Sequence, residues 1–338
     1  MARSPLAQPV PLRRRDIVVI GASAGGVEAL RDLVRALPPD LPAAVFVVLH
    51  LAPGGPSVLP AILQRAGSLP AVHPVHRERI LPGRIYVAPP DRHMLLHAGR
   101  IRLTVGPREN RSRPAIDPLF RSAAMEFGPR VIGIVLSGAL DDGTAGLRAI
   151  GEKGGLTVVQ DPEEALHPTM PRSALEAVPV DHCLKVAEIA NLLAATTSGA
   201  GEFESRIGAE ELQQPGNDEP PPGVFVCPEC HGPLHETDES GVLQFRCRVG
   251  HVFSPESLEV EKDADIERNL FLALQLVEDG ARLARRLAER ASTRGFPASE
   301  RRFREQARLR DEAASALRRL LVTRAPEAPE SEERPETA

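Results

Sequence analysis

One short turn, Gly21-Ala22-Ser23-Ala24-Gly25-Gly26, holds the first residue type suited to covalent chemistry. It follows an apolar run typical of a buried strand and precedes a run with helical spacing, residues 27–37. A serine between glycines on such a turn matches the nucleophile elbow, whose tight backbone exposes the hydroxyl. The free N–H groups of the following helix suit an oxyanion. A phosphate- or dinucleotide-binding turn is the alternative, although the G-x-G-x-x-G spacing and a Walker lysine are both missing.

Two more polar residues, His50 and Asp142, follow apolar runs that predict parallel strands. The carboxyl ends of parallel strands meet at one edge of a sheet, so Ser23, His50 and Asp142 are expected to lie together there. They could form a relay in which the serine attacks, the histidine takes its proton and the aspartate orients the imidazole. The chain order Ser, His, Asp differs from the α/β-hydrolase order Ser, Asp, His. Taken singly, the histidine could be structural and the aspartate a turn residue or helix cap.

A second group of residues has the spacing of a metal site. Cys227-x-x-Cys230 is followed, after sixteen residues, by Cys247-x-x-x-His251. Two chelating pairs at this separation predict one tetrahedral zinc, and with four protein ligands no position is left for water, so the zinc is expected to be structural. His231 and His235 are rival fourth ligands, and three reduced, unliganded cysteines are the alternative. The fourth cysteine, Cys183, is expected to be a small core residue.

Alternating strand and helix patterns between residues 16 and 197 must position the candidate relay. They predict an α/β domain with a doubly wound, mainly parallel, Rossmann-like sheet. The expected strands are 17–20, 43–49, 131–136 and 156–160, with several short strands in 71–105 that include 84–88 and a hairpin at 94–105. The expected helices are 27–37, 58–66, 113–127, 144–153 and 186–195.

The rest of the chain divides by composition. Residues 1–15 are expected to be disordered, 198–223 to be a proline- and glycine-containing linker, and 324–338 to be a disordered acidic tail. Residues 224–256 are expected to form a small zinc-binding module with a strand at 242–246, which needs its metal because it lacks a core. Ser254-Pro255 predicts a helix start. Residues 257–323 predict an antiparallel hairpin of two amphipathic helices, whose faces pack on each other or on a partner. The expected apolar positions are Ile266, Leu270, Leu274, Val277, Ala281, Ala284 and Leu287 in the first helix, and Phe303, Ala307, Ala314, Leu317 and Leu321 in the second.

Composition excludes several classes of protein. A net charge of −5, one tyrosine and no tryptophan argue against nucleic-acid binding. No run of 18 apolar residues predicts a membrane span, and the N-terminus lacks the apolar stretch of a secretory signal. Three clustered cysteines fit a metal site in a reducing cytoplasm better than a disulfide framework. We therefore expect a cytoplasmic protein with no membrane insertion.

Residues 16–197 resemble the catalytic domain of the chemotaxis protein-glutamate methylesterases (CheB type). The similarity rests on the turn around Ser23, the strand that ends on His50, the segments 86–94, 113–120 and 136–143, and Gln160-Asp161 with Met170-Pro171-Arg172. It implies a hydrolase of signal transduction that cleaves glutamate γ-methyl esters on chemoreceptor-type proteins, releases methanol, and also acts on glutamine by deamidation. The family's nucleophile, base and orienting acid fall on Ser23, His50 and Asp142, and its catalysis uses no cofactor. Similar C-terminal zinc modules accompany some methylesterase-like proteins, and this analogy supports the expected zinc-ribbon-like module.

Two departures from the family pattern affect this expectation. The turn has Ala24 where the family often has threonine, and residues 136–143 differ from the usual aspartate loop. Backbone N–H groups, which need no particular side chain, are therefore the expected oxyanion donors. Only 15 residues precede Asp16, so the sequence predicts no receiver domain in cis and leaves a receiver or methyltransferase as a partner in trans. The rival functions are a degenerate esterase domain that binds without turnover, which an intact Ser23, His50 and Asp142 argue against, and a nucleotide-binding α/β protein, which lacks a phosphate fingerprint.

Overall fold

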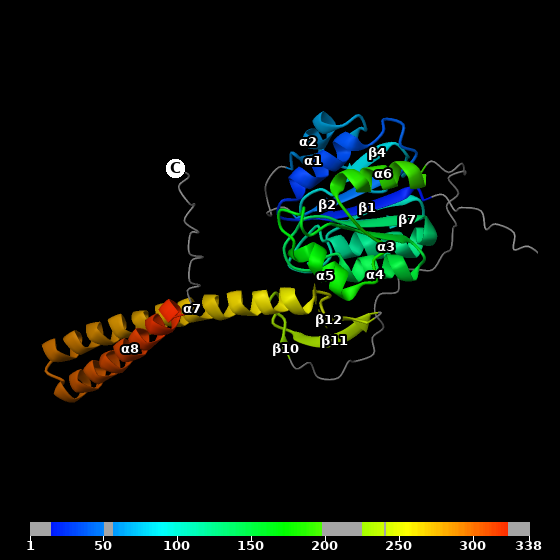
Figure 1. The fold of residues 1–338 in the computed structure, drawn as a ribbon. Coiled ribbons are helices and arrows are strands. Elements are labelled where there is room, and N and C mark those ends of the chain that lie inside the picture. The colour runs from blue at the N-terminus through cyan, green and yellow to red at the C-terminus, as the bar shows by residue number, and fades with distance from the viewer. Residues whose placement is uncertain (1–14, 51–56, 198–224, 240, 324–338) are drawn as a thin grey trace, which may run out of the picture. The chain divides into compact units, whose positions relative to one another are not determined.

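The computed structural model describes residues 15–50, 57–197, 225–239 and 241–323 (Figure 1). The chain divides into two compact units, one ending at Glu259 and the other beginning at Val260. The segments for which the sequence predicts an N-terminal tail, a linker and an acidic C-terminal tail lie outside the described residues, apart from Arg15.

A seven-stranded parallel sheet forms the centre of the first unit. Its strand order is β3-β4-β2-β1-β7-β8-β9, and each neighbouring pair is parallel. The strands are β1 (Ile17–Ala22), β2 (Ala44–Leu49), β3 (Ala71–Val72), β4 (Arg84–Val87), β7 (Val131–Val135), β8 (Leu156–Gln160) and β9 (His182–Leu184). Because the chain leaves β1 in both directions across the sheet, the doubly wound, mainly parallel α/β fold expected from the sequence is confirmed.

Helices cover both faces of this sheet (Figure 1). One face packs against α1 (Gly26–Ala36), α2 (Leu59–Ala66) and α6 (Val186–Thr197). The other packs against α3 (Ile116–Phe127), α4 (Thr144–Glu152) and α5 (Thr169–Ala177). Strand β1 shows the alternation: Val18 and Ile20 point to the first layer, whereas Ile17 and Val19 point to the second. A 3-10 turn, η1 (Gly128–Arg130), precedes β7, and β5 (His93–His97) pairs with β6 (Arg100–Thr104) as the hairpin predicted at 94–105.

Within the sheet domain, the structure corrects one sequence expectation and adds two elements that the patterns did not reveal, β9 and α5. Cys183, expected in the core, is exposed. It lies on β9, the edge strand of the sheet, which has one neighbouring strand and therefore little cover. Strand β9 contains only three residues, and in the nine-residue helix α5 only Met170, Pro171 and Ala174 are buried, so neither gives a strong apolar pattern.

The cysteine module, residues 225–239 and 241–253, is a four-stranded antiparallel sheet. Its strands are β10 (Phe225–Val226), β11 (Pro233–Glu239), β12 (Val242–Cys247) and β13 (Val252–Phe253), in sequential order. The strand predicted at 242–246 is therefore present. A small apolar cluster lies beneath the sheet and contains Cys227, Leu234, Phe245, Cys247, Phe253 and Leu258. The cysteine module belongs to the same compact unit as the seven-stranded sheet.

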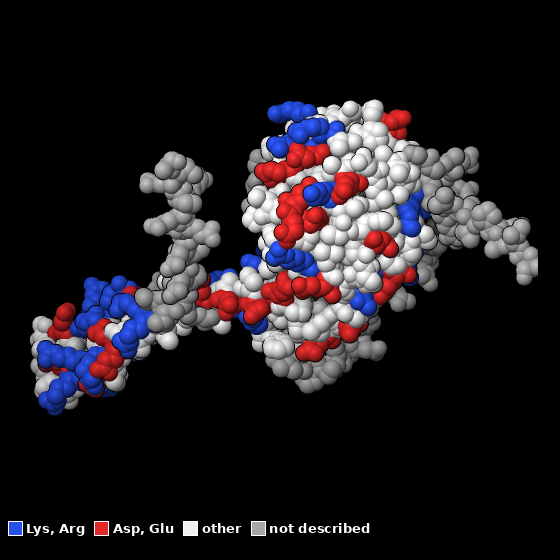
Figure 2. Space-filling model, in the orientation of Figure 1, with Lys and Arg blue, Asp and Glu red and all other residues white. Residues whose placement is uncertain are grey.

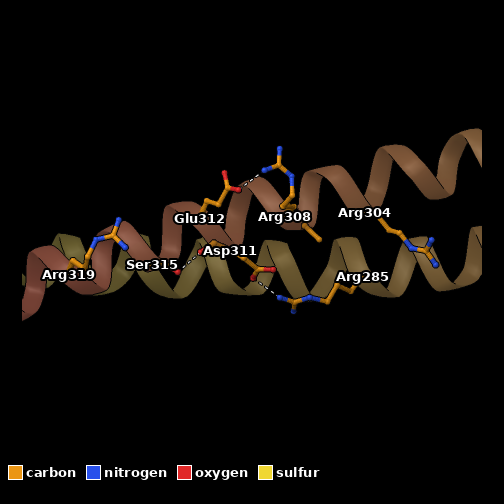
Figure 3. A pocket seen from close by; sticks show the side chains of 8 residues that line it. Arg285, Arg304, Arg308, Asp311, Glu312, Ser315 and Arg319 are labelled. Carbon is orange, nitrogen blue, oxygen red and sulfur yellow. Dashed lines mark hydrogen bonds and ion pairs between the residues drawn. The ribbon is translucent and has the colours of Figure 1, made fainter.

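Two long helices, α7 (Pro255–Thr293) and α8 (Pro297–Thr323), form the hairpin predicted from the sequence. The α7 helix begins after Ser254, whose hydroxyl accepts the backbone N–H of Ser257 at 3.2 Å, and the turn between the helices contains Gly295 with a φ of 73°. Figure 2 shows that charges of both signs mix on the hairpin surface, and Figure 3 shows Arg285 of α7 beside Asp311 of α8. These two side chains form an ion pair, with Arg285 Nη2 2.5 Å from Asp311 Oδ1.

The buried side of the hairpin matches the expected apolar face in part, because Ala281, Ala284, Ala307 and Ala314 are buried as expected while two of the larger side chains are not. Ile266 and Leu287 are exposed by 41% and 36%. The seam consists of small residues, Ala281, Ala284, Ala288 and Ala291 on α7 and Ala307 and Ala314 on α8. Alanines allow two helix backbones to approach closely, which leaves larger apolar side chains at the margin.

Candidate active site

Ser23 lies on the turn between β1 and α1. The turn needs a left-handed backbone conformation at Gly25, which favours glycine. Gly25 has a φ of 69°, and a Cβ added there would meet the Ser137 hydroxyl at 2.7 Å. The turn is fixed from the end of β7: the Ser23 N–H donates to the Ser137 carbonyl at 3.0 Å, and the Ser137 hydroxyl donates to the Ala24 carbonyl at 2.9 Å. Ser23 is therefore held at the carboxyl edge of the sheet by the loop of the neighbouring strand.

His50 follows β2 at the same edge. Its backbone N–H donates to the carbonyl of Ala22 at 3.2 Å, which places it beside the turn that carries Ser23. Its imidazole Nε2 lies 2.7 Å from the Asp142 carboxylate. Because Nε2 donates to that carboxylate, the other ring nitrogen, Nδ1, is left to accept a proton.

Asp142 follows β7 and is almost completely buried, with 1% of its side chain exposed. Besides His50, three groups donate to its carboxylate: the backbone N–H of Ile116 at 2.7 Å, that of Asp117 at 3.2 Å, and Asn110 Nδ2 at 2.9 Å. The two backbone donors form the N-terminus of α3, where a negative charge is favourable. Burial alone would raise the pKa of Asp142, but the hydrogen bond and charge of His50 and the other donors outweigh it and lower the pKa.

The serine end of the candidate relay is more open than the aspartate end. Ser23 is partly exposed, and its hydroxyl has no hydrogen-bond partner among the residues that the structure describes. The His50–Asp142 hydrogen bond of the candidate relay is therefore present. Ser23 lies at the end of the adjacent strand, but its hydroxyl makes no hydrogen bond to His50. Within the described part of the chain, the backbone N–H groups of Ala24 and Gly25 also donate to no partner, as expected of oxyanion donors at a helix start.

Two residues near Asp142 were not singled out by the sequence analysis. Asp117 is buried in the first turn of α3, and Asn110 lies in the preceding loop with a φ of 47°. Asn110 Nδ2 donates to Asp117 Oδ2 at 3.0 Å as well as to Asp142. Burial, then the charge of Asp142, raises the pKa of Asp117 well above its usual range. Asp117 lies in the segment 113–120 on which the family resemblance rests, whereas the polar loop that contains Asn110, residues 109–112, has no motif of its own.

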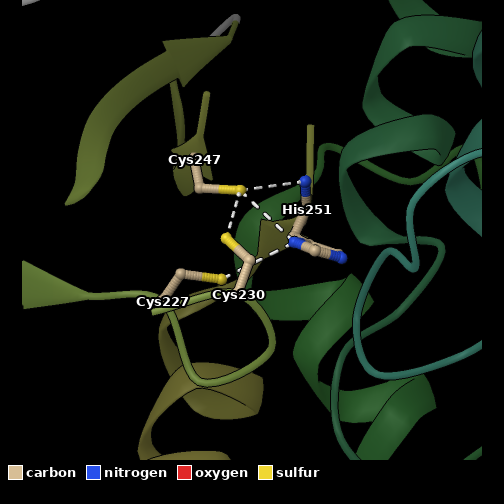
Figure 4. Close-up of side chains that lie close together, drawn as sticks. All are labelled: Cys227, Cys230, Cys247 and His251. Atoms are coloured by element: carbon tan, nitrogen blue, oxygen red, sulfur yellow. Dashed lines mark hydrogen bonds between the residues drawn. The ribbon is translucent and has the colours of Figure 1, made fainter. Parts of the chain in front are cut away.

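The four residues with metal-ligand spacing come together in the cysteine module (Figure 4). Their ligand atoms lie within 4.8 Å of one another. Cys230 Sγ is 3.6 Å from Cys247 Sγ, and His251 Nδ1 is 3.3 Å from Cys247 Sγ and 3.7 Å from Cys227 Sγ. Zinc bond lengths of about 2.3 Å to sulfur and about 2.0–2.1 Å to nitrogen require tetrahedral edges of roughly 3.8 and 3.6 Å. The donor set and its spacing fit a zinc ion, and the rivals His231 and His235 lie outside this group.

Comparison with known proteins identifies the family of the larger domain. The model of the CheB methylesterase family matches residues 18–193, more than half of the chain. The chain belongs to the CheB methylesterase family. Among the described residues no helix combines the length and the apolar character that a membrane span needs.

Relatives of this family match the same part of the chain. A protein-glutamate methylesterase/protein-glutamine glutaminase of Anaeromyxobacter dehalogenans is 40% identical over 191 residues, which are 56% of this chain and 56% of the relative. A putative protein of the same description from Leptospira interrogans is 38% identical over 178 residues, 52% of this chain and 92% of that protein. The chain thus spans about half of one relative and most of the other.

A solved structure shows the same fold. The crystal structure of the Thermotoga maritima CheB methylesterase catalytic domain matches with a TM-score of 0.51 and 31% identity. The match covers 97% of that chain and 53% of this one. The part of this protein that resembles the family therefore corresponds to a catalytic domain, and the cysteine module and hairpin are additional to the match.

Proposed function

We propose that this chain is a serine esterase that hydrolyses glutamate γ-methyl esters on chemoreceptor-type proteins. The observation that carries the proposal is the 2.7 Å contact between His50 Nε2 and the buried Asp142, at the sheet edge where the neighbouring turn presents Ser23. A hydroxyl, an imidazole and a carboxylate at one edge are the parts of a nucleophilic relay. The printed names of the family relatives supply the substrate class.

In this mechanism Ser23 Oγ attacks the ester carbonyl carbon while His50 Nδ1 takes its proton. The N–H groups of Ala24 and Gly25 stabilise the oxyanion. The tetrahedral intermediate collapses, the bond to methoxide breaks, and His50 returns the proton so that methanol leaves. Water then attacks the acyl-serine with His50 as base, which releases the glutamate side chain and restores the Ser23 hydroxyl. Asp142 holds the imidazole tautomer and stabilises its charged form. An amide in place of the ester yields ammonia, so the same site would deamidate glutamine.

The cysteine module is proposed to hold one structural zinc through Cys227, Cys230, Cys247 and His251. The support is the donor set and its near-tetrahedral spacing. When bound, the ion supplies cross-links between β10, β12 and the loops beside them. Catalysis itself needs no cofactor in this proposal, because the relay supplies both nucleophile and base.

The partners and location follow from the substrate class. We place the protein in the cytoplasm, where its thiols stay reduced. A methylated chemoreceptor or similar signalling protein would be its substrate, and a receiver or methyltransferase would act on it in trans. Neither nucleic-acid binding nor membrane insertion is part of the proposal.

Methanol release from a methylated receptor tests the function. Wild type is expected to release methanol, and Ser23→Ala is expected to release none above background. Ser315→Ala, an exposed serine change on α8, serves as the matched control and should match wild type. If Ser23→Ala retains full activity, the nucleophile is wrong, and if wild type binds the receptor without turnover, the chain is a binding module instead.

A further inference from the structure

The loop before α3 touches both the proposed active site and the cysteine module. At its centre, the Asn110 side chain is 4% exposed and uses both ends of its amide. Nδ2 donates to Asp142 Oδ1 and to Asp117 Oδ2. Oδ1 accepts the backbone N–H of Ser254 at 3.0 Å and the hydroxyl of Ser257 at 3.3 Å. The residues that support the orienting aspartate are thus bonded to residues that begin α7, 144 positions further along the chain.

Backbone pairing joins the same loop to β13. The Asn110 N–H donates to the Val252 carbonyl at 2.9 Å, and the Val252 N–H donates to the Arg108 carbonyl at 3.4 Å. Nearby, the Ser254 hydroxyl donates to Asp141, the residue before Asp142. The contact is buried, since Val252 is 0% and Ser254 is 5% exposed. Burial requires such polar groups to be paired, so this junction depends on the module keeping its shape.

The metal ligands determine the position of β13. His251 immediately precedes Val252, and the Cys247 N–H donates to the His251 carbonyl at 3.0 Å. The turn between these two ligands therefore sets where Val252 and Ser254 lie. The cluster beneath the module is small, so ligand bonds to a metal would supply much of its rigidity.

We propose that the cysteine module is a positioning element of the esterase, which orients the Asn110 amide on the Asp117–Asp142 carboxylate pair. The two ends of an amide have nearly the same shape, so only their partners decide which end faces which way. The donors of Ser254 and Ser257 select the orientation with Oδ1 toward the module and Nδ2 toward the carboxylates. The opposite orientation would place the amide oxygen against the charged Asp142 carboxylate and turn the amide N–H groups toward the backbone N–H of Ser254, so that donors would face each other.

The consequence concerns the imidazole. The Asn110 amide bridges two carboxylates that would otherwise face each other in a buried site, and Asp142 in turn holds His50. A loosened module would free Asn110 and so disturb the angle and charge of the His50–Asp142 pair. This inference rests on the proposed esterase function for its activity readout, but its structural readout does not.

A double-mutant cycle in the full-length protein tests the coupling. Asn110→Gly removes the amide without straining the left-handed backbone, and Cys230→Ser removes one metal ligand. Each is expected to lower kcat on a small soluble glutamate γ-methyl ester by about 10-fold or more, with a smaller change in KM. Because both act through the same amide, the double variant should be no slower than the slower single variant. Metal analysis must show that Cys230→Ser has lost its ion.

Two serine variants provide a matched pair that leaves the metal ligands intact. Ser257→Ala removes one donor to Asn110 and should lower kcat several-fold while keeping the metal. Ser173→Ala removes a contact from α5 to Glu256 of α7, 3.4 Å long, that does not reach Asn110. It should leave kcat unchanged. If both serine variants behave alike, the route through Asn110 is wrong.

The pH profile gives a readout that general damage to the fold would not produce. Besides Asn110, four titratable groups interact with Asp142: His50 at the end of β2, His93 on β5, Asp117 on α3, and Asp141 in the same loop as Asp142. Loss of the amide donor is expected to raise the pKa of Asp142, because that donor favours its charged carboxylate. The acid limb of kcat is therefore expected to move to higher pH in Asn110→Gly and, by the same amount, in Cys230→Ser.

The imidazole proton of His50 reports on the same coupling without turnover. Its NMR resonance should move in the same direction in Asn110→Gly, Ser257→Ala and Cys230→Ser, and stay at the wild-type position in Ser173→Ala. A metal-free Cys230→Ser with wild-type kcat, acid limb and imidazole resonance would overturn the inference, as would losses that simply multiply in the double variant. A wild type that shows no turnover defeats the proposed function instead, and the resonance still decides the coupling.

Discussion

The seven-stranded sheet domain and the cysteine module are held together by different means. The sheet buries apolar side chains on both faces, including Val18 and Ile20 on one and Phe120 on the other. The module's buried cluster has six members, and two of them, Cys227 and Cys247, are proposed metal ligands. Hydrophobic burial can stabilise the first by itself, whereas the small cluster of the second is expected to need the coordination bonds of the proposed zinc. The proposed function is divided in the same way, because the proposed reacting groups lie at the sheet edge and part of their hydrogen bonding comes from the module.

The largest expected difference between the two regions is in their dependence on metal. Cys227→Ser or Cys247→Ser should reduce the metal content from one zinc per chain to none, removing a contribution of about 10 kcal/mol or more. Amides of β11 and β12 should then exchange rapidly with solvent while those of β1 and β7 stay protected, which hydrogen exchange measures. Cys183→Ser, at the exposed cysteine, is the matched control and should change neither quantity. Equal loss of protection in both sheets would show that the sheet domain is not self-sufficient.

Substitutions of the candidate relay residues should lower turnover without lowering the stability of the sheet domain. Ser23→Ala or His50→Ala is expected to lower turnover by about 10⁴-fold or more, equivalent to roughly 5.5 kcal/mol, with Asp142→Asn somewhat milder. The three groups act as a unit, so removing either of the first two disables the relay. Methanol release measures the loss. The melting temperature of Ser23→Ala should equal that of wild type, and a lower value would mean that the turn also stabilises the fold.

Truncation of a core side chain in the sheet domain should lower its stability, unlike the substitutions in the candidate relay. Phe120 of α3 is fully buried against the sheet, and Phe120→Ala is expected to cost about 3–5 kcal/mol in the free energy of unfolding. The denaturant midpoint of the sheet domain measures it. Phe296 is 58% exposed, so Phe296→Ala should change the free energy of unfolding derived from that midpoint by less than about 0.5 kcal/mol. Similar shifts for both variants would contradict the assignment of stability to this core.

The smallest effect should come from the junction between the two regions. Burial, opposed by the Ser254 hydrogen bond, raises the pKa of Asp141 to about 7. A folded-state pKa above the unfolded value means that the protonated carboxyl stabilises the folded junction at low pH. That stability is lost as pH rises toward and through about 7, by no more than about 1.4 kcal/mol per pH unit. Thermal melting between pH 5 and 8 measures the slope.

A matched pair of variants assigns that slope. Asp141→Asn keeps the shape of the side chain without the titration and should flatten the pH dependence. Asp40→Asn, at an exposed position, should leave it as in wild type. A slope that persists in Asp141→Asn would have to arise elsewhere.

Local patterns in the sequence were enough to predict most of the fold and both candidate sites. Strand ends after apolar runs placed Ser23, His50 and Asp142 at one edge, because parallel strands share the direction of their carboxyl ends. Chelating pairs only a few residues apart placed the four proposed ligands, because such spacing already brings donor atoms close. Cys183 was misplaced because its sequence surroundings do not show that β9 lies at the edge of the sheet.

The sequence by itself determined the alternating α/β architecture, the turn that presents Ser23 and the spacing of the cysteine ligands, since each depends on neighbours within a few residues. Tertiary structure alone decided that Asn110 bonds to Asp117 and Asp142 on one side and to Ser254 and Ser257 on the other. No periodicity or motif links residues 144 positions apart. Their pairing follows from the burial of polar groups where the module meets the sheet domain, because every such group must find a partner once water is excluded.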